Sequence, residues 1–279
     1  MSCGLIIQYL LPKYLITKLA AKIAACQIPF IKNWLIKNYV KYYQINTSEI
    51  SKKLEEYRSL GDFFSRALTK DARKIAEGNN IICSPVDGTL REYGKIIKNQ
   101  LFTIKGKSFT LDQLLAVTDS SNSLFNNGEF TILYLSPKDY HRIHLPTDGK
   151  LTHMHYVPGT LFSVNPELIE TYPDILAKNE RLIIDFDTNC GKMAIIMVGA
   201  VIAGSIETTW HGTIKRSNTI SQWDFRQQEL SFKKGEEIGA FRLGSTVILL
   251  FTPNTVTWNQ SHQVGQPIKM GQPLATAVN

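Results

Sequence analysis

The chain has 279 residues, of which 43% are hydrophobic, and a formal net charge of +7. This length and composition support one large core with a small appendage and exclude a disordered chain. They also exclude a membrane-spanning helix, because even the most apolar stretch, residues 193–206, contains glycines and β-branched residues typical of a buried strand.

The positive charge is concentrated at the N-terminus. Residues 1–48 contain six lysines and no arginine, aspartate or glutamate, so they carry +6 and leave +1 for the rest. Two amphipathic helices are predicted here, one over residues 13–25 and one after Pro29. Their apolar faces consist of Leu15, Ile16, Leu19 and Ile23 in the first helix, and of Ile31, Trp34, Leu35, Tyr39 and Tyr42 in the second.

Lysines that frame an apolar and aromatic face are typical of a helix lying in the surface of an anionic membrane. At roughly 1 kcal/mol per basic residue, six lysines contribute about 6 kcal/mol at most, in addition to the apolar face. The alternative is that both faces pack against the protein, but the absence of acidic residues favours the membrane. Nucleic acid is not expected, because the basic residues alternate with apolar ones.

A charge-balanced helical stretch follows, up to a boundary near Arg66. We therefore expect a helical, membrane-associating region at residues 1–65 and a strand-rich region at residues 66–279. The second region consists of short apolar runs separated by Gly, Pro, Asn and Asp, which predict strands. The expected fold is α+β, with a mostly antiparallel β sandwich or barrel-like domain. The clearest runs are Phe130–Leu135, Leu182–Phe186, Met193–Val201 and Val247–Phe251.

One six-residue pattern occurs twice. Residues 85–90 read Pro-Val-Asp-Gly-Thr-Leu, and residues 146–151, 61 positions later, read Pro-Thr-Asp-Gly-Lys-Leu. Both predict an Asp-Gly turn that leads into a strand. Either the domain contains an internal duplication, or Pro-x-Asp-Gly is simply a favoured hairpin sequence; we expect the duplication. Such turns place side chains at strand ends, where distant segments converge.

The cysteines and most of the histidines carry no metal-ligand pattern. The four cysteines are far apart and form no C-x-x-C, which favours reduced thiols in a cytosolic or cytosol-facing location. No metal site is expected, because the histidines outside residues 139–146 lack ligand spacing. These residues are Cys3, Cys26, Cys83, Cys190, His153, His155, His211 and His262.

Leu243-Gly244-Ser245-Thr246 places a hydroxyl behind a glycine, directly before the apolar run Val247–Phe251. Taken alone, Gly-Ser-Thr is typical of a turn. This segment nevertheless resembles the self-cleavage sequence of the phosphatidylserine decarboxylases. Two further segments resemble the same family, residues 84–88 with Asp87 and residues 139–146 with His141 and His144. Other similar stretches extend the resemblance over almost the whole chain: residues 156–165, 198–200, 204–208 and 271–274.

The resemblance implies that Asp87, His144 and Ser245 act together in self-cleavage. A serine hydroxyl becomes a nucleophile when a base removes its proton, and a carboxylate holds that base in the right tautomer. His144 is the expected base and Asp87 its partner. The electrophile is the carbonyl of Gly244, where a missing Cβ permits close approach. β-Elimination of the resulting ester separates residues 1–244 from residues 245–279, and hydrolysis leaves a pyruvoyl group on residue 245.

In the mature enzyme, the resemblance implies, the pyruvoyl ketone forms a Schiff base with phosphatidylserine, which loses CO2 and becomes phosphatidylethanolamine. His144 is the expected proton donor. His141 is expected at the headgroup if residues 139–144 form a turn, since strand alternation otherwise separates it from His144. Ser163 and Asn165 are expected to bind the phosphate or headgroup. The long and short chains should form a heterodimer, dimerise further, and lie peripherally on the cytoplasmic side of the cell membrane.

Three other functions are weighed against this one. A pyruvoyl decarboxylase of a soluble amino acid derivative would share Gly244 and Ser245 but need no lysine-framed helices. An ordinary serine hydrolase would usually contain Gly-x-Ser-x-Gly, which does not surround Ser245. A carrier module is suggested by residues 264–274, which look like the closing strand of biotin- or lipoyl-bearing barrels. In those modules the modified lysine lies at a hairpin tip, whereas Lys269 adjoins the closing Gly-Gln-Pro-Leu segment.

Overall fold

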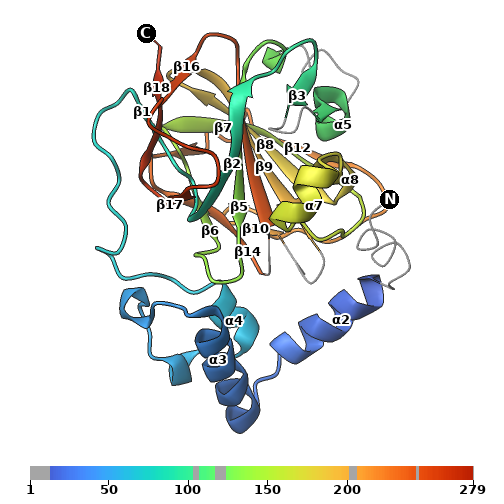
Figure 1. Ribbon diagram of the computed structural model, residues 1–279, viewed down its shortest axis with the longest axis vertical. Helices are drawn as coiled ribbons and strands as arrows, with labels where there is room; N and C mark the ends of the chain where they lie inside the picture. Colours follow the sequence, from blue (N-terminus) through green and yellow to red (C-terminus); the bar gives the residue numbers. More distant parts are fainter. Residues whose placement is uncertain (1–12, 103–106, 117–123, 201–205, 243–244, 279) are drawn as a thin grey trace.

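The computed structural model describes residues 13–102, 107–116, 124–200, 206–242 and 245–278 (Figure 1). Helices form the N-terminal part, and strands dominate from residue 81 onward. The predicted α+β organisation is confirmed. The N-terminal helices are α2 (Lys13–Ala24), α3 (Pro29–Tyr43), η1 (Thr47–Glu49), η2 (Leu54–Glu56) and α4 (Leu60–Phe64).

The N-terminal helices gather at one end of the strand-rich part (Figure 1). Helix α3 begins with Pro29, which suits a first helical turn because its missing N–H would have no partner there. It ends where Gln44 adopts a left-handed conformation and its N–H returns to the carbonyl of Val40. The helices share a small core of their own, made of Ile36, Ile45, Ile50, Tyr57 and Phe63.

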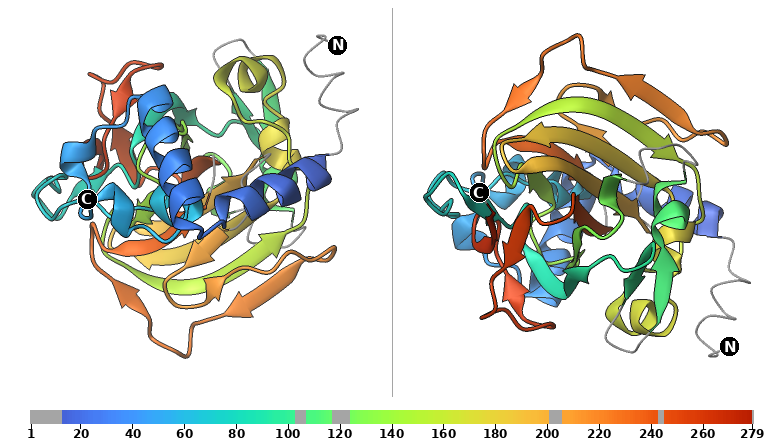
Figure 2. Two further views of the ribbon diagram at one scale, coloured as in Figure 1. Left: turned by 90° about the horizontal axis from the view of Figure 1, so that it is seen from below. Right: turned by 90° about the horizontal axis from the view of Figure 1, so that it is seen from above.

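A long antiparallel sheet forms the centre of the strand-rich part and is strongly curved (Figure 2). Its edge strands β12 and β17 do not pair with each other in the described ranges, so the sheet stays open and is not a closed barrel. Strand β13 (Ser231–Phe232) pairs with β7 beside β12. Across the sheet the order is β12 (Ser221–Asp224), β7 (Gly149–Val157), β8 (Arg181–Thr188), β9 (Gly191–Gly199), β15 (Ser245–Phe251), β5 (Glu129–Leu135), β2 (Gly88–Lys95) and β17 (Pro267–Ile268).

Smaller sheets and short helices cover the long sheet, and α7 and α8 lie against one of its faces (Figure 1). A four-stranded sheet contains β11 (Gly212–Thr213), β10 (Ile206–Thr208), β14 (Glu237–Phe241) and β6 (Arg142–His144). A three-stranded sheet contains β1 (Ile81–Cys83), β18 (Pro273–Ala277) and β16 (Val256–Trp258). The remaining elements are β3 (Gln100–Phe102), β4 (Ser108–Thr110), α5 (Leu111–Leu115), α7 (Pro166–Thr171) and α8 (Ile175–Lys178).

Strand β15 lies in the middle of the long sheet and is buried on both faces. It pairs with β9 on one side and with β5 on the other, and every one of its residues is buried. Val247 and Leu249 belong to one core cluster, and Ile248 and Leu250 belong to a second cluster on the opposite face. A continuous apolar run is what such a doubly covered strand requires.

The two Pro-x-Asp-Gly turns occupy equivalent places. Gly88 begins β2 and Gly149 begins β7, as predicted. The residues before the turns exchange backbone hydrogen bonds, because Cys83 N–H donates to Pro146 O at 3.0 Å and His144 N–H donates to Pro85 O at 2.9 Å. Positions 83 and 144 are separated by the same 61 residues as positions 85 and 146.

Each Pro-x-Asp-Gly turn is also hydrogen-bonded to a second turn, and the two pairs of turns have the same bonding pattern. Ser84 N–H donates to Gln272 O at 2.7 Å, and Leu145 N–H, 61 residues later, donates to Glu236 O at 2.9 Å. The side chains of Asp87 and Asp148 each accept a backbone N–H from their closing turn. The repeated hydrogen-bond pattern supports an internal duplication of this unit rather than two unrelated hairpins.

Candidate active site

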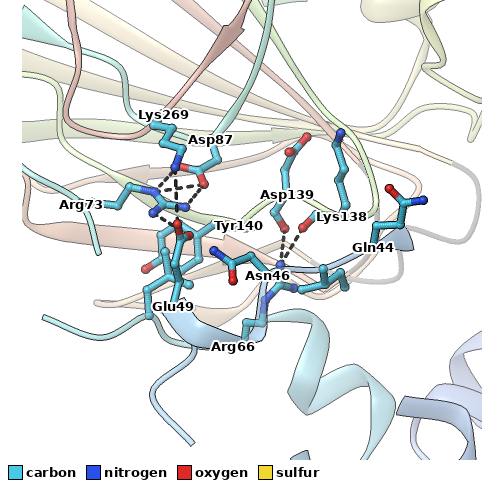
Figure 3. A pocket seen from close by; sticks show the side chains of 12 residues that line it. Gln44, Asn46, Glu49, Arg66, Arg73, Asp87, Lys138, Asp139, Tyr140 and Lys269 are labelled. Atoms are coloured by element: carbon cyan, nitrogen blue, oxygen red, sulfur yellow. Dashed lines mark hydrogen bonds and ion pairs between the residues drawn. The ribbon is translucent and has the colours of Figure 1, made fainter. Parts of the chain in front are cut away.

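Asp87 lies in the turn before β2, and only 9% of its side chain is exposed. Arg73 holds the carboxylate with two nitrogens: Nε donates to Oδ1 at 2.8 Å, and Nη2 donates to Oδ2 (Figure 3). The backbone N–H of Met270 donates to Oδ1 at 2.9 Å. These bonds fix the orientation of the carboxylate, since a bidentate guanidinium restricts both of its oxygens.

Arg73 is held in turn from the helical part. Its Nη1 lies 2.8 Å from Oε2 of Glu49, and Oε1 of Glu49 lies 3.4 Å from Nζ of Lys269. Burial lowers the pKa of Arg73, but the hydrogen bonds and charges of Asp87 and Glu49 outweigh burial and raise the pKa overall. The four charged side chains line a cavity of about 220 Å³ where the helical and strand-rich parts meet (Figure 3).

His144 ends strand β6, and both of its ring nitrogens have partners. Nδ1 lies 2.8 Å from Gly235 O, and Nε2 lies 3.0 Å from the hydroxyl of Tyr140. A carbonyl oxygen only accepts, so we assign the ring proton to Nδ1 and leave Nε2 to accept from Tyr140. Burial lowers the pKa of His144, although the Gly235 carbonyl and the charge of Glu237 oppose this shift. Nε2 is therefore an unprotonated, basic nitrogen at neutral pH.

His141 is fully buried, with its ring 4.1 Å from that of Phe64. Nδ1 lies 2.9 Å from the carbonyl of Asp139, whereas Nε2 has no hydrogen-bond partner among the described residues. Burial lowers the pKa of His141 to about 3, so the ring is neutral. Nε2 of His141 is thus a buried ring nitrogen that has no partner among the described residues.

The end of the helical part forms hydrogen bonds with the segment that carries both histidines. Arg66, which follows α4, donates from Nη2 to Lys138 O at 2.7 Å and to Asp139 O at 3.1 Å. In the other direction, Arg142 donates from Nε to Ser65 O at 2.9 Å. The histidine segment is thus positioned by the end of the helical part as well as by β6.

Ser245 is the first residue of β15 and is completely buried. Its Oγ has no hydrogen-bond partner within the described ranges. It pairs with Leu135 on β5 and with Gly199 on β9. Gly244, which was expected to supply the cleaved carbonyl, lies outside the described residues.

The structure brings some predicted site residues close to one another and leaves others apart. The backbone bond from His144 to Pro85 places His144 beside the Asp87 turn. No side-chain hydrogen bond joins Asp87, His144 and Ser245 in the part of the chain that is described, and the carbonyl of Gly235, rather than Asp87, sets the His144 tautomer. Asn165 is exposed at the start of α7, where its Oδ1 accepts from Leu168 N at 2.8 Å and its N–H lies 3.3 Å from Ser163 Oγ. The hydrogen bonds described for Asn165 stay within residues 163–169 and do not reach the histidines.

Sequence reasoning missed Tyr140 and Arg73. Tyr140 lies inside the segment that carries the histidines, and its spacing of four residues from His144 was the available signal. Arg73 stands in the mixed-charge stretch of residues 70–74, which is typical of a solvated segment, and only the fold reveals its burial against Asp87. The described residues contain no cluster of three or more His, Cys, Asp or Glu side chains that could hold a metal ion.

Comparison with known proteins identifies the family of this chain. A family model described as phosphatidylserine decarboxylase matches residues 60–276, and a second, described as PSD, matches residues 5–44. The chain is 42% identical over 275 residues to the phosphatidylserine decarboxylase proenzyme of Dechloromonas aromatica, covering 98% of this chain and 97% of that protein. The proenzyme of the same name from Legionella pneumophila is 42% identical over 272 residues, covering 96% and 95%.

The matching segments include the Asp87 turn, the histidine segment and strand β15. The family model thus spans the elements that carry Asp87, His144 and Ser245, whereas Glu49 lies outside residues 60–276. The chain belongs to the phosphatidylserine decarboxylase family.

Proposed function

We propose that this chain cleaves itself between Gly244 and Ser245 and then decarboxylates phosphatidylserine to phosphatidylethanolamine and CO2. Family membership supports the reaction, and the arrangement around position 245 supports the self-cleavage. The observation that carries the proposal is the fully buried Oγ of Ser245, which has no partner among the described residues. A buried hydroxyl without a partner costs about 1–3 kcal/mol. Thr246 Oγ1 is buried without a described partner as well, and the position of Ser245 directly after Gly244 distinguishes the two hydroxyls.

His144 is proposed as the base for this cleavage. Its Nε2 is unprotonated and accepts from the Tyr140 hydroxyl at 3.0 Å, a hydrogen bond that has to break before Nε2 takes the Ser245 proton. The charge of Asp87 favours the protonated form of His144, which arises when the base takes the Ser245 proton. The Ser245 oxygen then bonds to the Gly244 carbon, and the Gly244–Ser245 amide bond breaks. Elimination at residue 245 releases the 1–244 carboxylate, and hydrolysis consumes water and releases ammonia to leave a pyruvoyl group.

The residues present fit a pyruvoyl group at position 245. Ser245 is buried at the start of β15, where Cα of residue 245 would carry the ketone and Cβ its methyl group, and this ketone would supply the electron sink for decarboxylation. His141, with a neutral ring and an unpartnered Nε2, is proposed to contact the headgroup. His144 is proposed to return the proton after CO2 leaves. Ser163 and Asn165 stay predictions as headgroup or phosphate ligands.

The two products of cleavage are proposed to stay together. Strand β15 of the short chain, residues 245–279, lies between β5 and β9 of the long chain, residues 1–244. Strand β18 pairs with β1 of the long chain as well. Buried pairing on both sides of β15 supports a heterodimer that survives the loss of one covalent bond. Further dimerisation of this pair is also a prediction.

The helical region, proposed as residues 1–65, is expected to rest on the cytoplasmic surface of the cell membrane as a peripheral anchor. Large apolar side chains stand exposed along α2 and α3. They are Leu19, Ile23, Ile28, Phe30, Ile31, Trp34 and Tyr42. Lys18, Lys22 and Lys41 are exposed beside them, whereas Lys32 is buried and donates to Glu55 O at 2.8 Å. An exposed apolar face with lysines around it supports binding to an anionic lipid surface.

No described helix is long and apolar enough to cross a membrane.

Replacement of Ser245 tests the proposal directly. Ser245→Ala should give a full-length protein on a denaturing gel, without activity on phosphatidylserine vesicles, while the unaltered chain splits into fragments of residues 1–244 and 245–279. Intact mass of the short fragment should show a pyruvoyl N-terminus. Cleavage of the alanine variant at the same bond would overturn the assignment.

A further inference from the structure

Three residues stand side by side across the long sheet where β15 begins. Ser245 pairs with Gly199 on β9. On the other side of β9, Arg181 pairs with Val198, and the same register places Glu180 opposite Gly199. The Gly199 N–H donates to Glu180 O at 2.9 Å, which confirms this placement.

Ser245 and Glu180 point to the same face of the sheet. Directly opposite residues in antiparallel strands share a face, and every second residue along a strand returns to it. The neighbours at that spacing belong to one core cluster: Leu182 and Ile184 on β8, Met197 and Ile195 on β9, and Val247 and Leu249 on β15. Gly199 therefore places no side chain of its own between Glu180 and Ser245, and the position above its Cα is called the slot.

The carboxylate of Glu180 fills the part of this slot that lies over Gly199. A Cβ added to Gly199 would lie 3.1 Å from Glu180 Cγ and 3.2 Å from its Oε1. Because opposite Cβ atoms are about 4.5–5.5 Å apart, Oε1 lies within roughly 9 Å of Cβ of Ser245. Glu180 is thus within reach of an amine that approaches residue 245.

Glu180 is almost fully buried, with 5% of the residue exposed, and is held by two partners. Arg216 binds both of its oxygens, from Nη2 to Oε1 and from Nε to Oε2, each at 2.8 Å. The hydroxyl of Tyr156 donates to Oε2 at 3.2 Å. A buried ion pair gives little net stability compared with apolar side chains of the same volume. Its presence beside the reacting residue therefore indicates a role in binding.

We propose that Glu180 binds the primary ammonium group of the phosphatidylserine headgroup next to residue 245. This inference rests on the proposed pyruvoyl function. The amine reaches the site as a cation, and a fixed carboxylate attracts it and holds it beside the reacting carbonyl until its proton passes to water and the nitrogen attacks. Arg216 and Tyr156 are positioning residues that hold the carboxylate over the slot.

Binding to an unprocessed protein tests Glu180 separately from the chemistry. In the Ser245→Ala background, which cannot form the pyruvoyl group, Glu180→Gln should weaken calorimetric binding of a short-chain phosphatidylserine about tenfold. Binding of the matching phosphatidylglycerol, which has no amine, should not change. Equal affinity for phosphatidylserine with and without Glu180 would overturn the inference.

Activity of the processed protein provides a second test. Glu180→Gln should cleave itself normally and react normally with phenylhydrazine, a neutral reagent for ketones, yet lose roughly 10- to 100-fold in kcat/KM for phosphatidylserine. The double variant Glu180→Gln/Arg216→Gln removes the unpaired guanidinium. If Glu180 binds the amine, the double variant stays as impaired as the single one, whereas recovery of activity would show a purely structural pair.

A matched control separates this effect from the loss of any ion pair. Arg91 and Glu170 form another ion pair, away from the slot. Glu170→Gln should leave both the phosphatidylserine affinity and kcat/KM unchanged. Loss of self-cleavage in Glu180→Gln would assign this residue to processing and contradict the amine site. Cleavage of Ser245→Ala would instead contradict the proposed function itself.

Discussion

The two Pro-x-Asp-Gly turns share one backbone frame but differ in what surrounds the aspartate. Asp87 accepts the Met270 N–H at 2.9 Å, and Asp148 accepts the Lys234 N–H at 2.8 Å. The buried guanidinium of Arg73 covers Asp87 and pairs with it, so that only 9% of the aspartate side chain is exposed. Asp148 is 41% exposed and faces Lys233, which is 82% exposed.

The comparison shows which residues the turn itself requires and which residues only the proposed reaction requires. Both copies form the same hydrogen bonds, so the turn requires an aspartate but no guanidinium. Arg73 comes from the linker and Glu49 from the helical part, and neither belongs to the repeated unit. The helical part thus converts one of two equivalent turns into an enclosed, charged site, and this couples its docking to the proposed self-cleavage.

Replacing each aspartate in turn should give the largest contrast. Asp87→Asn breaks the buried pair with Arg73 that encloses the site and removes one of the charges that favour protonated His144, and it should slow self-cleavage by at least about 100-fold, or roughly 2.7 kcal/mol. Asp148→Asn should cleave at the normal rate, because its turn adjoins no reacting group. Cell-free translation followed by denaturing gels at timed intervals measures both rates. Equal rates from the two variants would show that Asp87 serves only its turn.

Replacing the cations next to the two aspartates should give a contrast in stability rather than in the rate of cleavage. Arg73→Gln leaves two carboxylates without their shared partner, and the free energy of unfolding should fall by about 3 kcal/mol. Lys233→Gln should have no measurable effect, because exposed ion pairs contribute little. Arg73→Lys should recover only part of the loss, since an ammonium group lacks the bidentate fork. Urea unfolding of these variants in the Ser245→Ala background checks this order, and equal midpoints would contradict it.

The sequence predicted the parts of the fold that depend on local pattern. The two amphipathic helices correspond to α2 and α3, and the apolar runs correspond to β5, β8, β9 and β15. The repeated Pro-x-Asp-Gly correctly marked the first residues of β2 and β7. These features follow from periodicity and turn chemistry, which neighbouring residues determine.

The partners of the site residues could not be predicted in this way. Arg73 meets Asp87 only because the linker runs past the first turn, and Glu180 stands near Ser245 only because three strands pair in one register. Nothing in the residues next to Arg73 or Glu180 distinguishes them from solvated charges. The same limit applies to the tautomer of His144, which a backbone carbonyl 91 residues away determines.

The smallest expected effect is a shift in the pH dependence of self-cleavage. It concerns the strands that precede the two turns, in which His144 and Cys83 occupy equivalent positions. Self-cleavage needs an unprotonated His144 Nε2, and burial lowers the pKa of His144 below its usual 6.5. The rate should therefore stay constant from neutral pH downward and fall only below pH 6.5. Glu237 raises the pKa of His144 and Arg142 lowers it, so Glu237→Gln should move the acid limb to still lower pH. Cys83→Ser should leave the limb in place. Timed gels across this pH range would contradict the assignment of the base if the limb moved upward in Glu237→Gln.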